Sequence, residues 1–131
     1  MAKDGSLYFD ARGQSVSGLF KSVLNNGKYS EPDQIGDLFD SDYVDNCKSM
    51  DNMIIMSDRR SGRFHYELFV SFHKKDGTWS VPVYLGESFH GGKRASLGKI
   101  TPEGKYLFFL RDFSFYWVNA ELIEKLRPAD L

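Results

Sequence analysis

The segment KDGTWSVPVYLG at residues 75–86 has a second copy in the chain, NNGKYSEPDQIG at residues 25–36, and this repeat is the main indication of the fold. The copies share a Gly, an aromatic residue, Ser, Pro and a final Gly in the same register. The Asn-Gly and Asp-Gly pairs within them predict hairpin turns, since such turns need a positive φ that Gly adopts freely. Pro32 and Pro82 cannot donate a hydrogen bond to a neighbouring strand, so each copy should form the outermost strand of a sheet.

A wider repeat surrounds these two copies. An acidic residue, Gly or Asn, one further residue and three apolar residues recur in DGSLYF, DNMIIM and EGKYLF, at residues 4–9, 51–56 and 103–108. A second apolar segment follows each, namely GLFKS at 18–22, ELFVS at 67–71 and FYWVN at 115–119. A repeat of this length with several short strands per unit indicates a blade-like sheet in each copy.

The middle segments are apolar on both alternating faces. Ile54, Ile55 and Met56 run together, as do the residues from Tyr106 to Leu110. A strand with one face in water would alternate apolar and polar residues. These apolar runs therefore predict sheets packed between two others, as propeller blades are. We therefore expect an all-β protein of antiparallel, four-stranded, propeller-type blades that form a partial propeller, with a two-layer sandwich as the alternative.

The segments SDRRSGRFHYELFVSFHKKDGTWSVPVYLG (57–86) and TPEGKYLFFLRDFSFYWVNAELIEKLRP (101–128) resemble repeats of the TolB-like, WD-like β-propeller family. Blades of that family typically read SPDGKYLFF, SDR with a Gly-rich loop, a strand such as DIYV, then W-x-x-P-x-x-L-G. The resemblance covers residues 47–128 closely and implies about two and a half blades from the C-terminal part of a propeller. The implied units are blade one at 4–36, blade two at 47–86, blade three at 94–119 and a short helix at 120–126, capped by Asn119.

The blade order of the family also places the strands. They are expected at 7–10, 18–24 and 30–35 in blade one, at 47–50, 53–57, 67–73 and 81–85 in blade two, and at 95–100, 106–111 and 115–119 in blade three.

Composition excludes several classes of partner. The chain of 131 residues has 17 basic and 18 acidic side chains and a net charge of −1, with no run of like charge, so we expect no nucleic-acid partner. No segment reaches the roughly 18 apolar residues that span a bilayer, and we expect neither a signal peptide in this chain nor a membrane partner. The family resemblance implies a periplasmic or secreted full-length protein. The single Cys47 excludes an internal disulfide.

The most site-like stretch follows the second copy of the apolar triplet. Charged and aromatic side chains are dense there, and the ligand-binding candidates are Asp58, Arg59, Arg63, Phe64, His65 and Tyr66. An Asp after a strand also caps its own turn, so turn architecture is the competing interpretation.

Groups for catalysis and metal binding are sparse in the sequence. His65, His73 and His90 follow no metal-ligand spacing, and no nucleophile elbow or phosphate-binding Gly loop occurs. We expect no catalytic residues, no metal and no cofactor. Trp79 and Trp117 lie within the repeat segments and are predicted to be core residues.

The leading hypothesis is therefore a non-catalytic binding or protein-interaction module, with a protein or a glycan as ligand. One alternative is an enzyme that resembles propeller glycoside hydrolases, with Asp58 and Glu67 as acid and base, which requires two facing carboxyl groups in one cleft. The other is a purely structural half-propeller without a ligand.

Two and a half blades cannot close a ring. The outer faces of blades one and three should then lie open, with Leu7, Tyr8, Phe9, Leu107, Phe109, Tyr116 and Trp117 among their residues. Large apolar faces and unpaired strand edges favour association, and two-fold dimers are the commonest solution. We therefore expect a homodimer, and the alternative is a missing N-terminal half that completes the ring in the natural protein.

Overall fold

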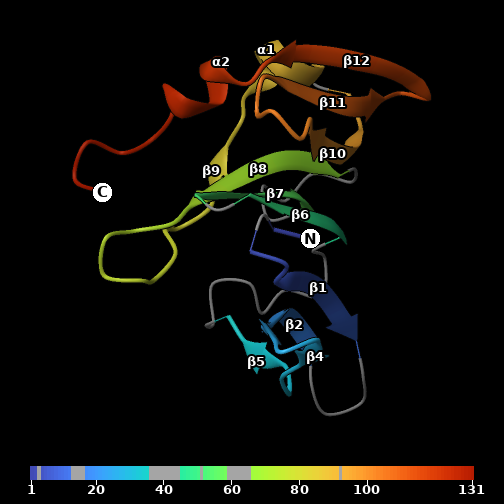
Figure 1. The fold of residues 1–131 in the computed structure, drawn as a ribbon. Coiled ribbons are helices and arrows are strands. Elements are labelled where there is room, and N and C mark those ends of the chain that lie inside the picture. The colour runs from blue at the N-terminus through green and yellow to red at the C-terminus, as the bar shows by residue number, and fades with distance from the viewer. Residues whose placement is uncertain (3, 13–16, 36–44, 51, 59–65, 92) are drawn as a thin grey trace.

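A computed structural model describes residues 1–2, 4–12, 17–35, 45–50, 52–58, 66–91 and 93–131. Across these residues the chain is mostly β, in antiparallel sheets, with two four-residue helices, one of them near the C-terminus (Figure 1). The first sheet has the order β1-β2-β5, the second β6-β7-β8-β9 and the third β10-β11-β12, and β3 and β4 form a separate hairpin.

The strand bounds agree with most of the ranges that the sequence predicts. The first sheet and its hairpin contain β1 (Leu7–Arg12), β2 (Ser17–Ser22), β3 (Leu24–Asn25), β4 (Lys28–Tyr29) and β5 (Asp33–Gln34). The second contains β6 (Asp45–Met50), β7 (Met53–Asp58), β8 (Glu67–Phe72) and β9 (Val83–Tyr84). The third contains β10 (Ala95–Ile100), β11 (Tyr106–Arg111) and β12 (Ser114–Asn119).

The turn and edge predictions are confirmed. Asn26 and Gly27 have φ of 49° and 77° and close the two-residue turn between β3 and β4, and Gly77 has a φ of 84° in the equivalent turn of the second copy. Pro32 and Pro82 each precede the last strand in the order of their sheet, β5 and β9 respectively. Residues without a backbone N–H therefore stand where no further strand needs one.

The first two copies of the repeat share a pair of serine hydrogen bonds, although the second copy has one more residue between the two serines. Ser22 donates from Oγ to the carbonyl oxygen of Ser30 at 2.6 Å, and Ser71 makes the same bond to Ser80 at 2.5 Å. The N–H of the residue after the first serine donates to the Oγ of the second serine, at 3.0 Å in copy one and 2.9 Å in copy two. One unit of structure therefore occurs twice in succession.

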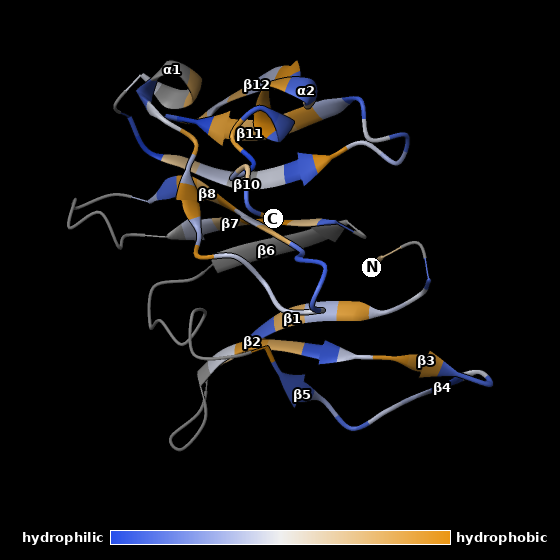
Figure 2. Ribbon diagram, turned by 90° about the vertical axis from the view of Figure 1, so that its left-hand side faces the viewer, coloured by the Kyte–Doolittle hydropathy of each residue, from blue (hydrophilic) through white to orange (hydrophobic). Residues whose placement is uncertain are grey.

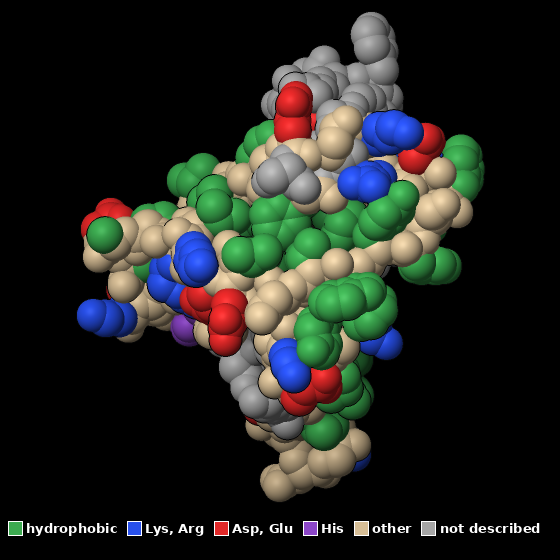
Figure 3. Space-filling view, turned by 90° about the horizontal axis from the view of Figure 1, so that it is seen from above, with side chains coloured by type: hydrophobic (Ala, Val, Ile, Leu, Met, Phe, Trp, Pro, Cys, Tyr) green, Lys and Arg blue, Asp and Glu red, His purple; other side chains and the backbone are tan. Residues whose placement is uncertain are grey.

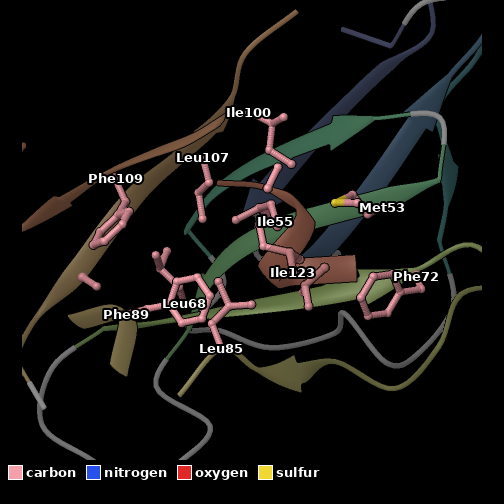
Figure 4. Packing of buried hydrophobic residues seen from close by; sticks show 13 residues of the cluster. Met53, Ile55, Leu68, Phe72, Leu85, Phe89, Ile100, Leu107, Phe109 and Ile123 are labelled. Atoms are coloured by element: carbon pink, nitrogen blue, oxygen red, sulfur yellow. The ribbon is translucent and has the colours of Figure 1, made fainter. Parts of the chain in front are cut away.

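The three sheets lie one above another, with the second sheet in the middle (Figure 2). Residues 53–57 of β7 and all six residues of β8 are buried, as expected for a sheet covered on both faces. Ile54, Met56 and Phe69 face the first sheet and pack with Leu19 and Trp79. The opposite face of β7 and β8 packs on the third sheet and on the short helices, and the labelled residues of this core appear in Figure 4.

The third copy is shifted by one residue relative to the other two, and this corrects the prediction for its faces. Leu107 and Phe109 were expected on the open face, yet both are buried against the second sheet, with exposures of 0% and 1%. The N–H of Thr101 donates to the carbonyl of Tyr106 at 2.9 Å, which leaves four residues, 102–105, in the turn before β11. Leu107 therefore faces the preceding sheet, as Ile54 does in the second copy, and such a shift of one residue moves every following side chain to the other face of the strand.

The open face of the first sheet was also predicted only in part. Tyr8 points to the second sheet, where its ring meets Trp79 edge-on at 6.0 Å, whereas Phe9 and Phe20 stack on the outer face at 6.1 Å. In the third sheet, Tyr116 lies beside the inward-facing Phe109 and is 39% exposed.

Neighbouring sheets come closest at their first strands. β1 contacts β6, and β10 contacts β6, β7 and β8. A Cβ built on Gly98 in β10 would lie only 2.6 Å from Cγ2 of Ile55 in β7, so the close approach requires a glycine. The sheets therefore lie closest together at one edge and diverge toward the other edge.

The C-terminal helix fills the space beside the third sheet. α2 (Glu121–Glu124) is shorter than the predicted helix, and Asn119 still caps it, because its Oδ1 accepts the N–H of Glu121 at 2.9 Å. Ile123 is fully buried, and Glu124 accepts a hydrogen bond from Asn52 at 3.2 Å. A second helix, α1 (Glu87–His90), was not predicted.

Candidate binding surfaces

The predicted ligand-binding segment lies largely outside the described residues. Asp58 is the last residue of β7, Tyr66 immediately precedes β8, and Arg59, Arg63, Phe64 and His65 fall between them among the residues that are not described. Tyr66 is half-buried; its carbonyl accepts the N–H of Ala95 at 2.9 Å, and its ring centroid lies 5.9 Å from the guanidinium of Arg94. Tyr66 therefore joins β8 to the start of the third sheet.

The carboxylate of Glu67 is buried within the protein. Its exposure is 0%, and its Oε1 accepts the hydroxyl of Tyr84 at 3.1 Å. The strand register places the backbone of Asp58 opposite Glu67. In this position Glu67 has no access to solvent, which an acid or base that acts on a sugar chain would need.

The outer face of the third sheet carries a concentration of exposed aromatic side chains. Phe115 and Trp117 are 76% and 61% exposed, and Phe108, which pairs with Trp117 across β11 and β12, is 42% exposed. Tyr106 meets Trp117 edge-on at 5.1 Å on the same face. Figure 3, which looks down on this side of the molecule, shows a band of hydrophobic side chains with lysine or arginine side chains beside it. Contiguous apolar surface of this kind marks interaction sites in soluble proteins.

The exposure of Trp117 overturns its predicted place in the core, whereas Trp79, which is 9% exposed, confirms its own. The difference follows from the strands that carry them. Trp79 lies between the first and second sheets, whereas none of the described sheets covers the outer face of β12, where Trp117 is exposed.

The turn between β11 and β12 presents another aromatic residue under backbone strain. Asp112 and Phe113 have φ of 48° and 70°, in the left-handed region, which glycine, asparagine and aspartate adopt more readily than a bulky residue such as Phe113. Phe113 is 86% exposed, so side-chain burial does not compensate for this conformation. Lys93 bridges to Asp112 at 3.3 Å and ties the turn to the segment before β10.

Cationic side chains stack on tyrosines of both faces of the third sheet, on Tyr116 at the inner face and on Tyr106 at the outer one. The guanidinium of Arg111 lies 3.7 Å from the ring centroid of Tyr116, and Nζ of Lys105 lies 5.1 Å from that of Tyr106. Hydrogen bonding with Tyr106, together with nearby charge, raises the pKa of the fully exposed Lys105 above 10.5. Like other exposed lysines, Lys105 is positively charged at neutral pH, and it lies beside Tyr106 at the aromatic surface.

The first sheet has an outer face of its own. Leu7, Phe9 and Phe20 are half-buried there, and Tyr29 in the β3–β4 hairpin is 45% exposed. Tyr29 donates from its hydroxyl to the carbonyl of Gly5 at 3.3 Å. This face is therefore less exposed than that of the third sheet but likewise apolar.

Other candidates from the sequence carry little chemistry. His73 is exposed, and its ring packs edge-on against Trp79 at 4.9 Å; the side chains of Cys47 and His90 and all of His65 lie outside what the structure describes. Within the described ranges, no group of three or more His, Cys, Asp or Glu side chains could hold a metal ion. The helices that the structure describes are all too short or too polar to cross a membrane.

Comparison with known proteins gives no relative from which a function could be transferred. The chain matches no family model, no curated protein and no solved structure.

Proposed function

We propose that this chain is a non-catalytic interaction module built from TolB-like, WD-like propeller blades, and that its binding surfaces lie on its open sheet faces and on the segment 58–66. Antiparallel sheets that lie closest at one edge, and a pair of serine hydrogen bonds that occurs in both the first and the second sheet, support the propeller assignment. The fold class alone leaves the ligand open.

The observation that carries the proposal is the outer face of the third sheet. Phe115 and Trp117 stand on one β-strand at positions i and i+2, so both point away from the core in a fixed geometry. Large aromatic side chains supply most of the binding energy at protein interfaces, and they also stack on sugar rings. Exposure of large aromatic side chains to water costs free energy, and a protein that binds nothing through them gains nothing in return.

Binding of the purified chain to glycan and peptide arrays tests the proposal. Two variants separate the candidate surfaces, F115S/W117S for the sheet face and R59A/R63A for the segment 58–66. The control is L122S, because Leu122 on α2 is 44% exposed and belongs to neither surface. We expect a bound ligand that one of the two variants loses and that the control keeps. Silence on every array, or binding that both variants retain, contradicts the proposal.

The glycoside-hydrolase alternative has no comparable support. It requires Glu67 to reach a substrate, and Glu67 is fully buried with Tyr84 as a partner.

A further inference from the structure

We infer that the outer face of the third sheet docks on the outer face of the first sheet of a second copy of this chain, and that the reciprocal contact closes a ring of six sheets. The inference rests on the proposed blade architecture. It names the occupant of both open faces, which the proposed function leaves unspecified.

The outer face of the first sheet is the counterpart of a face that is covered elsewhere in the same molecule. Through the repeat, Leu7, Phe9, Phe20 and Tyr29 correspond to Ile54, Met56, Phe69 and Trp79 of the second sheet. Those four residues of the second sheet are buried under the first sheet. The outer face of the first sheet therefore has the chemistry of a surface that receives a neighbouring sheet.

The outer face of the third sheet is the counterpart of the face that does the covering. The one-residue shift in the third copy aligns Leu107 with Ile54, because both point to the preceding sheet. Phe108 then corresponds to Ile55, and Phe115 and Trp117 correspond to Leu68 and Val70. Ile55, Leu68 and Val70 form the surface that the second sheet presents to the third.

The two open faces are therefore the two halves of a contact that this chain already makes twice. The first sheet packs on the second, and the second packs on the third, each time with the same pair of faces. A second copy that repeats this contact needs no new kind of surface, and it continues an interface already present.

Because the sheets diverge from one close edge, the number of sheets in a closed ring limits the number of copies of the chain. Sheets that approach at one edge turn about a common axis, and propellers close with about four to eight sheets. Three sheets are too few, two copies give six and three copies give nine. A pair of chains joined through two identical head-to-tail contacts has two-fold symmetry, the commonest symmetry of homo-oligomers.

Light scattering and sedimentation of the full chain at micromolar concentration test the inference with three single variants. We expect the wild type at twice 15.0 kDa. W117R alters one half of the contact and Y29R the other, and each should weaken the dimer about tenfold or more, whereas L122R should leave it unchanged. Circular dichroism verifies that each variant is folded.

Each other result overturns the inference. A folded wild-type monomer excludes the second copy, and assemblies larger than two exclude the six-sheet ring. A dimer that responds to W117R and not to Y29R joins like faces instead of unlike ones. A dimer that responds to neither uses another surface.

A cross-linking experiment is independent of whether these variants fold. In a C47S background, one sample carries W117C and another carries Y29C, and a short bis-maleimide reagent is added to each alone and to their mixture. Head-to-tail docking gives cross-linked dimers in the mixture above either sample alone; cross-linking within the W117C sample alone overturns it. A monomer that still binds an array ligand contradicts this inference and leaves the proposed function standing.

Discussion

Ser71 donates its hydroxyl proton to the carbonyl oxygen of Ser80 at 2.5 Å, and the hydroxyl of Ser80 in turn accepts the N–H of Phe72 at 2.9 Å. This pair of bonds ties β8 to the segment that leads into β9. The same pair, formed by Ser22 and Ser30, ties β2 to the segment before β5. The difference between them is burial, since Ser80 is buried and Ser30 is exposed.

Replacement of Ser80 by Ala should therefore destabilise the chain more than the same change at Ser30. S80A leaves the N–H of the buried Phe72 without its partner, which costs about 1–3 kcal/mol. In S30A, water can replace the lost hydroxyl, so the cost should be below about 1 kcal/mol. Urea denaturation of both variants measures the difference. Equal losses would mean that the burial of the serine does not control the strength of this link.

A side chain at Gly98 should separate the second and third sheets. Its Cβ would lie 2.6 Å from Cγ2 of Ile55, so G98A should lower the free energy of unfolding by about 1–3 kcal/mol. In a double-mutant cycle, I55A should reduce the cost of G98A, because it removes the atom that clashes. Strictly additive losses would show that Gly98 is needed for another reason.

The strained turn between β11 and β12 offers a stabilising substitution. Phe113 has a φ of 70° and is 86% exposed, so F113G should relieve the left-handed strain without loss of packing and stabilise the chain by about 1 kcal/mol. The reverse substitution at another turn, G27A, serves as the control. It places a side chain on a residue with a φ of 77° and should destabilise the chain by a similar amount. Thermal denaturation reports both changes. A lower Tm for F113G would reveal a stabilising contact of the Phe113 ring.

Asp76 should make the stability of the chain depend on acid pH. Hydrogen bonds from the hydroxyl and the backbone N–H of Thr78 hold the pKa of Asp76 below its ordinary value of 3.8. Because the folded state lowers this pKa, the stabilisation is complete above pH 3.8 and is lost as the pH falls through the folded value. Thermal denaturation across this range should show a smaller acid loss for D76N than for the wild type.

Asp4 makes a similar local contact and should also contribute to the loss of stability in acid. The backbone N–H and hydroxyl of Ser6 lower the pKa of Asp4 in the same way, so D4N/D76N should have a smaller acid loss than D76N alone. If all three proteins lose stability in parallel, neither carboxylate controls the acid transition.

Local signals in the sequence predicted the strands, the hairpin turns and the edge position of the prolines. Gly27 and Gly77 mark the turns because only glycine adopts their φ without strain, and Pro32 and Pro82 mark the edges because they lack an N–H. Each of these signals acts within a few residues, so a single sequence suffices to interpret it.

The orientation of the third sheet could not be predicted in the same way. A run of apolar residues from Tyr106 to Leu110 does not say which alternate set faces inward, and the pairing of β10 with β11 around the preceding turn decides it. The exposure of Trp117 depends on whether another sheet covers it, which its own segment does not encode. The helix α1 has neither strong caps nor a repeated apolar spacing, and it forms where Phe89 packs into the core.

The burial of β7 and β8 on both faces has a consequence for how the chain unfolds. Neither outer sheet can detach without exposing one side of the buried middle strands, so partial opening of the stack costs free energy even where the other core stays packed. The amide hydrogens of β7 and β8 should therefore exchange with solvent only when the whole molecule unfolds, whereas those of the β3–β4 hairpin, whose residues are exposed, exchange through local fluctuations. We therefore expect the middle sheet to be the last part of the molecule to lose its structure.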